Sequence, residues 1–260
     1  MAEKKRRRLI VAVVSVVAVI VVAAVLGPYI YIHFIEGPAP AKLELPSSSA
    51  TTTTSKGSVT TPSSSSLDGT WNVGSGSQAG YRVVQEVLVG QNATAVGRTS
   101  KIWGSMTMSG STVTKGSFMV DMASVVSDQS QRNARFDGPI MDVNQFPTAT
   151  LTHSAPIDLG TIPADGVVEH YNAVGDLDMH GVTKSVTFPV TAERVGSGTD
   201  VLADLPITFS EWNIANPSIG GFVTTANSGT LEVLLHVTQG PGTPPRSRPE
   251  PPDRSAAAAR

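Results

Sequence analysis

The five histidines of the chain are the side chains most suited to metal binding or to proton transfer. They are His33, His153, His170, His180 and His236. Zinc needs three or four ligands that converge on one point, and the histidines show neither the HxH nor the HExxH spacing that would bring them together. Cysteine is absent, which excludes thiolate metal sites and disulfide bonds. We therefore predict no metal site and no cofactor.

The sequence also lacks the residue arrangements that are typical of hydrolytic enzymes. It contains no G-x-S-x-G nucleophile elbow, and its serines are densest between residues 47 and 66, in a low-complexity stretch. Asp176 and Asp178 fall on the same face of a predicted strand, where an exposed strand surface explains them better than a pair of catalytic carboxylates. These observations predict a protein that is not an enzyme.

Residues 67–238 are dominated by the alternation of apolar and polar side chains that is typical of β-strands. The apolar faces of four such runs are Phe118, Val120 and Met122; Val186, Phe188, Val190 and Ala192; Val201, Ala203, Leu205, Ile207 and Phe209; and Leu231, Val233, Leu235 and Val237. Residues 124–140 are the best place for a short helix or an ordered loop. The segment is long enough to bury about 70% of its unfolded surface as one all-β domain.

Short stretches rich in Gly, Asp and Ser separate the predicted strands. They lie at residues 109–111, 137–139, 165–166, 180–181 and 197–198. Glycine accepts a positive φ and aspartate bonds its own backbone, so each stretch predicts a turn. Strands that follow one another without intervening helices exclude a Rossmann or TIM architecture and favour an antiparallel barrel or sandwich.

The N-terminal 35 residues predict a membrane-spanning helix. Residues 4–8 are all basic, and residues 9–35 are almost wholly apolar. A helix over 9–35 would be about 40 Å long, more than the ~30 Å hydrocarbon core of a bilayer. The basic segment 1–8, with its five cations at residues 4–8, places the N-terminus in the cytoplasm and the rest of the chain outside it, in a single-pass topology. The alternative is a signal peptide that is cleaved near residues 39–41, and it also exports the domain.

The predicted domain is flanked by a Ser/Thr/Pro linker at residues 37–66 and by a Pro/Arg/Ala tail at residues 239–260. Both compositions are typical of disorder, so the linker is expected to be a flexible stalk, either plain or O-glycosylated. Residues 67–238 carry 8 basic and 16 acidic side chains, a formal charge near −8. Because this acidic domain has no basic stripe, we predict no nucleic-acid partner.

Three stretches, in order, carry a family pattern. They contain Asp68-Gly69-Thr70-Trp71 and Gly80-Tyr81-Arg82-Val83; Gln145-Phe146-Pro147-Thr148; and Met179-His180-Gly181-Val182-Thr183-Lys184 with Ser210-Glu211-Trp212-Asn213. Together they resemble the YceI-like family, particularly its actinobacterial membrane-anchored form, over residues 68–238. The resemblance implies an all-β fold: an extended, lipocalin-like, eight-stranded antiparallel barrel, here preceded by one N-terminal transmembrane helix. It also implies a long apolar channel for an isoprenoid or another amphiphilic lipid.

The chain departs from the family pattern at one place. Asn133 follows Arg132 where the family usually has an Arg-Asp pair, so any contact of that pair with the loop or with a ligand head group is expected to be weaker.

Most large apolar side chains of the domain are expected to form plain core, and two or three aromatic rings to line the channel. The candidates for lining it are Ile102, Trp103, Met106, Phe118, Phe136, Phe146, His180, Phe188, Phe209 and Trp212. Ile102, Met106 and Met108 share one strand face, and methionine adapts well to a lipid tail. His180 precedes Gly181 in a predicted turn, so a bond from its ring to nearby backbone is the alternative to a ligand contact.

The predicted function is non-catalytic binding, for storage or transport, of a polyisoprenoid or a fatty-acid-like lipid outside the cytoplasmic membrane. Its predicted partners are that lipid and, through the N-terminal helix, the membrane itself. The alternative is a cell-envelope protein–protein interaction module with a solid barrel. Eight strands leave an interior that side chains can just fill or that can hold one slender ligand, so the volume of the interior distinguishes the two hypotheses.

Overall fold

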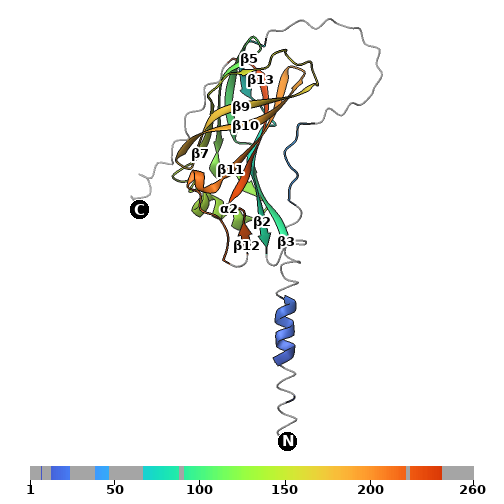
Figure 1. The fold of residues 1–260 in the computed structure, drawn as a ribbon, viewed down its shortest axis with the longest axis vertical. Coiled ribbons are helices and arrows are strands. Elements are labelled where there is room, and N and C mark those ends of the chain that lie inside the picture. The colour runs from blue at the N-terminus through green and yellow to red at the C-terminus, as the bar shows by residue number, and fades with distance from the viewer. Residues whose placement is uncertain are drawn as a thin grey trace, which may run out of the picture.

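A computed structural model describes residues 7, 13–23, 39–46, 67–87, 91–220 and 223–241 (Figure 1). Thirteen strands in this part of the chain form one sheet. They are β1 (Gly69–Val73), β2 (Gln78–Val87), β3 (Gln91–Thr99), β4 (Ile102–Ser109), β5 (Thr112–Asp121), β6 (Val126–Ser127), β7 (Thr148–His153), β8 (Ile157–Asp158), β9 (Val168–Met179), β10 (Val182–Val195), β11 (Gly198–Thr208), β12 (Val223–Thr225) and β13 (Ser228–Gln239).

Eight of these strands close into an antiparallel barrel, as predicted. The ring runs β1–β4–β5–β7–β9–β10–β11–β13, and the pairing of β13 with β1 closes it. Closure pairs the backbone of every strand in the ring on both sides, so the ring itself has no edge.

Strand β1 pairs with only part of β13, and β2 pairs with a second part of it, so the two strands together extend the barrel wall along β13. Residues 230–234 of β13 pair with β2, and residues 237–239 pair with β1. At the interruption, the backbone N–H of Gly74 donates to the carbonyl of His236 at 2.7 Å, and the backbone N–H of His236 donates to Ser77 Oγ at 2.9 Å. The backbone groups of β13 therefore stay paired where its partner changes.

The predicted strand faces are confirmed. Phe188 and Val190 are buried at 6% and 9% exposed, while Thr187 and Pro189 on the other face of β10 are exposed. The apolar members of the runs in β11 and β13 all face the barrel interior. Because side chains alternate across a strand, the period-two pattern was sufficient to identify the inner wall.

The short helices gather at one end of the barrel, which we call the helical end (Figure 1). They are η2 (Met122–Ser124), α2 (Ser130–Arg135), η3 (Phe136–Ile140) and η4 (Phe209–Trp212), and β12 lies with them. The opposite end carries the β4–β5 and β10–β11 turns. The prediction of a short helix within residues 124–140 is therefore confirmed.

Two turn predictions need correction. Residues 137–139 lie within η3, a π-helical stretch in which the backbone N–H of Met141 donates to the carbonyl of Phe136 at 3.0 Å. Pro139 lacks an N–H, and the wider π-helical turn continues α2 around it. The β10–β11 turn lies at residues 196–197, one residue earlier than predicted, because Gly196 takes the positive φ of +59°.

The predicted membrane-spanning segment is described only in part. Residues 13–23 are helical and exposed. The other residues of the predicted helix, 9–12 and 24–35, lie outside the described part of the chain. Among the described residues, no helix is both long enough and apolar enough to cross a membrane.

The flanking segments are described in part as well. Within the predicted linker, residues 39–46 lie against the barrel and bury Leu43 to 8% exposed. Of the predicted tail, only residues 239–241 are described.

Candidate functional site: a hollow barrel interior

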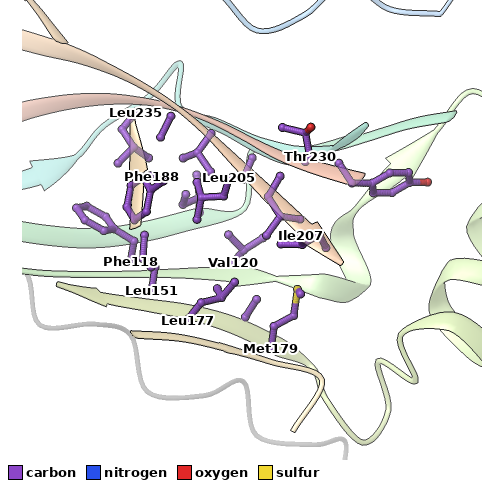
Figure 2. Close-up of a pocket in the computed structure, with 18 of the residues that line it drawn as sticks. Phe118, Val120, Leu151, Leu177, Met179, Phe188, Leu205, Ile207, Thr230 and Leu235 are labelled. Atoms are coloured by element: carbon purple, nitrogen blue, oxygen red, sulfur yellow. The ribbon is translucent and has the colours of Figure 1, made fainter. Parts of the chain in front are cut away.

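The inner wall of the barrel encloses a cavity of about 440 Å³. Figure 2 shows side chains from β5, β7, β9, β10, β11 and β13 that point into it: Phe118, Val120, Leu151, Leu177, Met179, Phe188, Leu205, Ile207 and Leu235. The lining of the middle of the barrel is almost wholly apolar. Small-molecule sites typically have volumes of about 300–1,000 Å³ and predominantly apolar walls, so the interior has the size and character of a ligand site.

Six of the ten predicted channel-lining residues line this cavity. They are Ile102, Met106, Phe118, Phe136, Phe188 and Phe209. Their position in the cavity wall is observed, whereas their contact with a ligand stays a prediction. The other four, Trp103, Phe146, His180 and Trp212, are not among the lining residues.

Trp103 faces the outside of the barrel. It follows Ile102 on β4 and lies opposite Met119, whereas its neighbour Gly104 lies opposite the inward-facing Phe118. Since successive side chains of a strand point to opposite faces, Ile102 and Trp103 cannot both enter the cavity.

Phe146, His180 and Trp212 instead hold the β9–β10 hairpin against η4 at the helical end. The Phe146 and His180 rings meet edge to face at 4.7 Å between centroids. The His180 Nδ1 lies 2.9 Å from the carbonyl oxygen of Trp212, and the Lys184 Nζ lies 5.7 Å from the centre of the Trp212 ring. The His180 ring thus bonds backbone, although this backbone is 32 residues away along the chain.

Polar side chains line the cavity towards its two ends. At the helical end they are Gln85, Gln129, Gln131, Arg132 and Arg135. Towards the opposite end they are Tyr171, Glu193, Arg194 and Thr199. Burial, and then the nearby Glu169 carboxylate, raise the pKa of Tyr171 above the usual 10, even further from physiological pH, so its phenol is a neutral hydrogen-bonding group. The cavity can therefore accept an apolar chain along its middle and a polar group near either end.

An aromatic pair narrows the cavity at the helical end. The ring of Tyr81 on β2 stacks on Phe136 of η3, with centroids 5.1 Å apart and an angle of 14° between the planes. Gly97 on β3 makes room for it, because a Cβ there would lie 2.4 Å from the Tyr81 ring. Burial raises the pKa of Tyr81 to about 12. The alternation of Ala79, Tyr81 and Val83 could have identified Tyr81 as a lining residue from the sequence.

One polar atom lies unpaired beside the apolar middle of the cavity. His153 ends β7 on its inner face, next to Gly116 and Phe118. Its Nε2 is buried and has no hydrogen-bond partner within the described structure. Burial lowers the pKa of His153 below its usual 6.5, because the charged imidazolium loses its hydration. The Nε2 of the neutral ring can donate a hydrogen bond to an oxygen-bearing ligand or accept one from it, depending on the tautomer.

The Arg132-Asn133 departure is accommodated locally. The Oδ1 of Asn133 accepts hydrogen bonds from the backbone N–H of Ser127 at 2.7 Å and from Ser127 Oγ at 2.8 Å. Arg132 pairs with Asp128 and also lines the cavity. Asn133 therefore fixes the loop without a carboxylate, while Arg132 remains beside the interior.

Comparison with known proteins agrees with this architecture. The solved structure of a polyisoprenoid binding domain from Saccharophagus degradans, implicated in plant cell wall breakdown, matches 65% of this chain and 98% of its own, with a TM-score of 0.52 and 16% identity; it shares the fold. A UPF0312 protein of Vibrio vulnificus strain YJ016 is 37% identical over 87 residues, and one of Vibrio parahaemolyticus is 32% identical over the same length. These matches span 33% of this chain and only 41% of the curated relatives. The family model of the YceI-like domain matches residues 50–237, and this chain belongs to that family.

Proposed function

We propose that the barrel binds one long-chain amphiphile, such as a polyisoprenoid or a fatty-acid-like lipid, and stores or carries it without chemical change. The cavity carries the proposal. Its apolar middle can desolvate a hydrocarbon chain, and burial of apolar surface contributes about 25 cal/mol per Å². The polar groups near its ends can bind a head group. The alternative of an interaction module with a solid barrel is disfavoured, because a cavity of about 440 Å³ leaves the interior unfilled.

The proposal includes a location outside the cytoplasmic membrane. Five cationic residues, followed by the apolar residues 9–35, support a single-pass anchor with its N-terminus in the cytoplasm. Carbonate washing at alkaline pH is expected to leave the full-length chain in the membrane fraction, and protease added to spheroplasts is expected to release a barrel fragment. A mature N-terminus near Lys42 would instead indicate a cleaved signal peptide.

Native mass spectrometry of the protein made in a bacterial host tests the binding function. One lipid per chain is the expected result, and lipid extraction identifies it. A protein that repeatedly emerges without lipid, and that takes up no prenol or fatty acid on titration, would contradict the proposal.

A pair of adjacent substitutions on β11 separates the interior from the rest of the barrel. Ala203 lines the cavity, while Leu202 lies on the other face of the strand. Ala203→Phe is expected to occupy the hollow and to reduce bound lipid at least tenfold while the barrel stays folded. Leu202→Phe adds a ring of the same size outside and is expected to leave lipid binding unchanged. Equal lipid occupancy in both variants would place the ligand elsewhere.

A further inference from the structure

Residues 39–46 form an extended segment, here named the clip, that lies along the outside of the barrel (Figure 1, blue segment beside β2 and β3). The Nη2 of Arg82 donates to the carbonyl of Pro40 at 2.8 Å, and Arg98 donates to the carbonyl of Ala41. Lys42 pairs with Asp204 at 3.6 Å, and Leu43 is buried. The clip is therefore held by polar and apolar contacts, in a stretch whose composition is that of a flexible stalk.

The clip adds two hydrogen-bond acceptors to a buried charge cluster. Glu232 is 0% exposed, and its two carboxylate oxygens accept hydrogen bonds from Arg82 Nε at 2.6 Å and Arg98 Nη2 at 3.0 Å. Each guanidinium has donors left over after these bonds, and one clip carbonyl accepts a further hydrogen bond from each of them. Since buried charges are stable only when they are paired and hydrogen-bonded, the cluster favours the docked clip.

The direction of the clip can be read from its contacts. Its start lies at Arg82, which pairs with Thr230 on β13. Its last residue, Pro46, shares a small hollow with His236, six residues further along β13 towards the opposite end. The clip therefore runs from the helical end towards the opposite end, with its N-terminal residues nearer the helical end.

The clip also shortens the tether between the barrel and the proposed membrane helix. If the helix ends at Ile35, then Pro40 is five residues on, and a fully extended chain spans at most about 17 Å over that length. Without the clip, a coil from Ile35 to Leu67 would have an average span of about 31 Å and a far longer maximum.

A 17 Å tether restricts which end of the barrel can face the membrane. Arg82 is five residues from Val87 at the helical end, which is about 13 Å along the barrel axis after a strand tilt of about 40°. Its partner Thr230 is nine residues from Gln239 at the opposite end, which is about 23 Å along the barrel axis after a strand tilt of about 40°. The tether is too short to bring the opposite end onto the bilayer while Arg82 holds Pro40.

We propose that the clip holds the barrel with its helical end on the membrane surface, so that lipid passes between the bilayer and the cavity at that end. This inference rests on the proposed lipid-binding function and membrane anchor. The partner surface is the bilayer of the membrane in which the same chain is anchored. Gln129, Gln131, Arg132 and Arg135 lie at this end of the cavity, where they meet the lipid head groups first.

Single-cysteine labelling of the full-length chain tests the orientation, since the chain has no cysteine of its own. Ser210→Cys marks an exposed position in η4 at the helical end, and Ser197→Cys marks an exposed position in the β10–β11 turn. Each variant carries a nitroxide and is placed in phosphatidylglycerol nanodiscs that contain a nickel-chelating lipid. The label at residue 210 is expected to relax at least threefold faster than the label at residue 197.

Two changes should bring the ratio of the two relaxation rates to about one. Leu43→Asp puts a charge at the buried position of the clip and should release it, whereas Glu44→Gln, at an exposed neighbour, should keep the ratio. Insertion of ten Gly/Ser residues after Glu36 leaves the clip intact, lengthens the tether, and should also bring the ratio towards one.

Each contrary result has a distinct meaning. Equal relaxation at the two positions in the parent chain, or an unchanged ratio in both the Leu43→Asp and the insertion variant, overturns the orientation. Failure of the chain to enter nanodiscs overturns it through loss of the anchor. Native mass spectrometry of the same samples reports bound lipid independently, so a failed orientation with bound lipid leaves the proposed function standing.

Discussion

On β13, Val237 and Glu232 are both 0% exposed, but they face opposite sides of the barrel wall. Val237 lines the cavity with Leu235 and Val233. Glu232 faces outward and is bonded by Arg82 and Arg98, beneath the clip. Inside, burial needs only apolar surface, and the hollow leaves freedom in side-chain size. Outside, the same degree of burial is stable only while three charged groups and two carbonyls keep their geometry. The inner wall is therefore expected to tolerate changes in side-chain shape but not in polarity. The outer cluster is expected to tolerate neither kind of change.

The largest expected effect comes from a charge placed on the inner wall. Phe188→Asp should lower the free energy of unfolding by about 4–5 kcal/mol, because the carboxylate would be buried among apolar groups without a partner. Thr187→Asp, one residue away on the exposed face of β10, should change it by less than about 1 kcal/mol. Urea unfolding followed by tryptophan fluorescence measures both. Similar losses at the two positions would contradict the inward register of β10.

Loss of the outer charge cluster should have the next largest effect. Glu232→Gln removes the only negative charge that bonds both Arg82 and Arg98 in the described structure, and it should cost about 3 kcal/mol. Asp204 lies on the neighbouring strand β11, and Asp204→Asn breaks its exposed pair with Lys42 of the clip, which should cost about 0–1 kcal/mol. If the two losses, measured by the same urea titrations, were equal, the cluster would be no more than a surface ion pair.

The same contrast explains how much could be predicted from the sequence. The inner wall was predictable because one local rule, alternation, assigns every second residue of a strand to the interior. Applied strictly, that rule also excludes Trp103 once Ile102 is placed inside. The other three residues, Phe146, His180 and Trp212, lie in loops, turns and short helices, where alternation does not predict which way a side chain points. Their aromatic character alone could not distinguish a channel-lining residue from one that packs a hairpin.

The outer cluster could not be predicted in the same way. Glu232 lies at an alternating polar position of β13, where an exposed carboxylate is the ordinary expectation. Its burial depends on Arg82 and Arg98, which are 150 and 134 residues away, and on the clip. Only the pairing of β2 with β3 and β13 brings these residues together. Local composition also predicted that residues 39–46 belong to a flexible stalk, because composition contains no information about a docking surface that is distant in the sequence.

The smallest expected effect tests the ring of His153, a titratable group beside the apolar middle of the cavity. Because burial lowers the pKa of His153 in the folded protein, the unfolded chain binds a proton first as the pH falls below 6.5. The stability that the neutral ring retains at pH 7.5 should therefore be lost as the pH falls through 6.5 and then through the lower folded pKa. His153→Phe fills a similar volume without titrating, so its stability should fall less between pH 7.5 and 5.5 than that of the parent. Urea unfolding at half-unit pH steps measures the difference. Parallel pH profiles for the two proteins would mean that the ring is hydrated in the folded barrel, and that the cavity wall beside Phe118 is wetter than the inner face of β13.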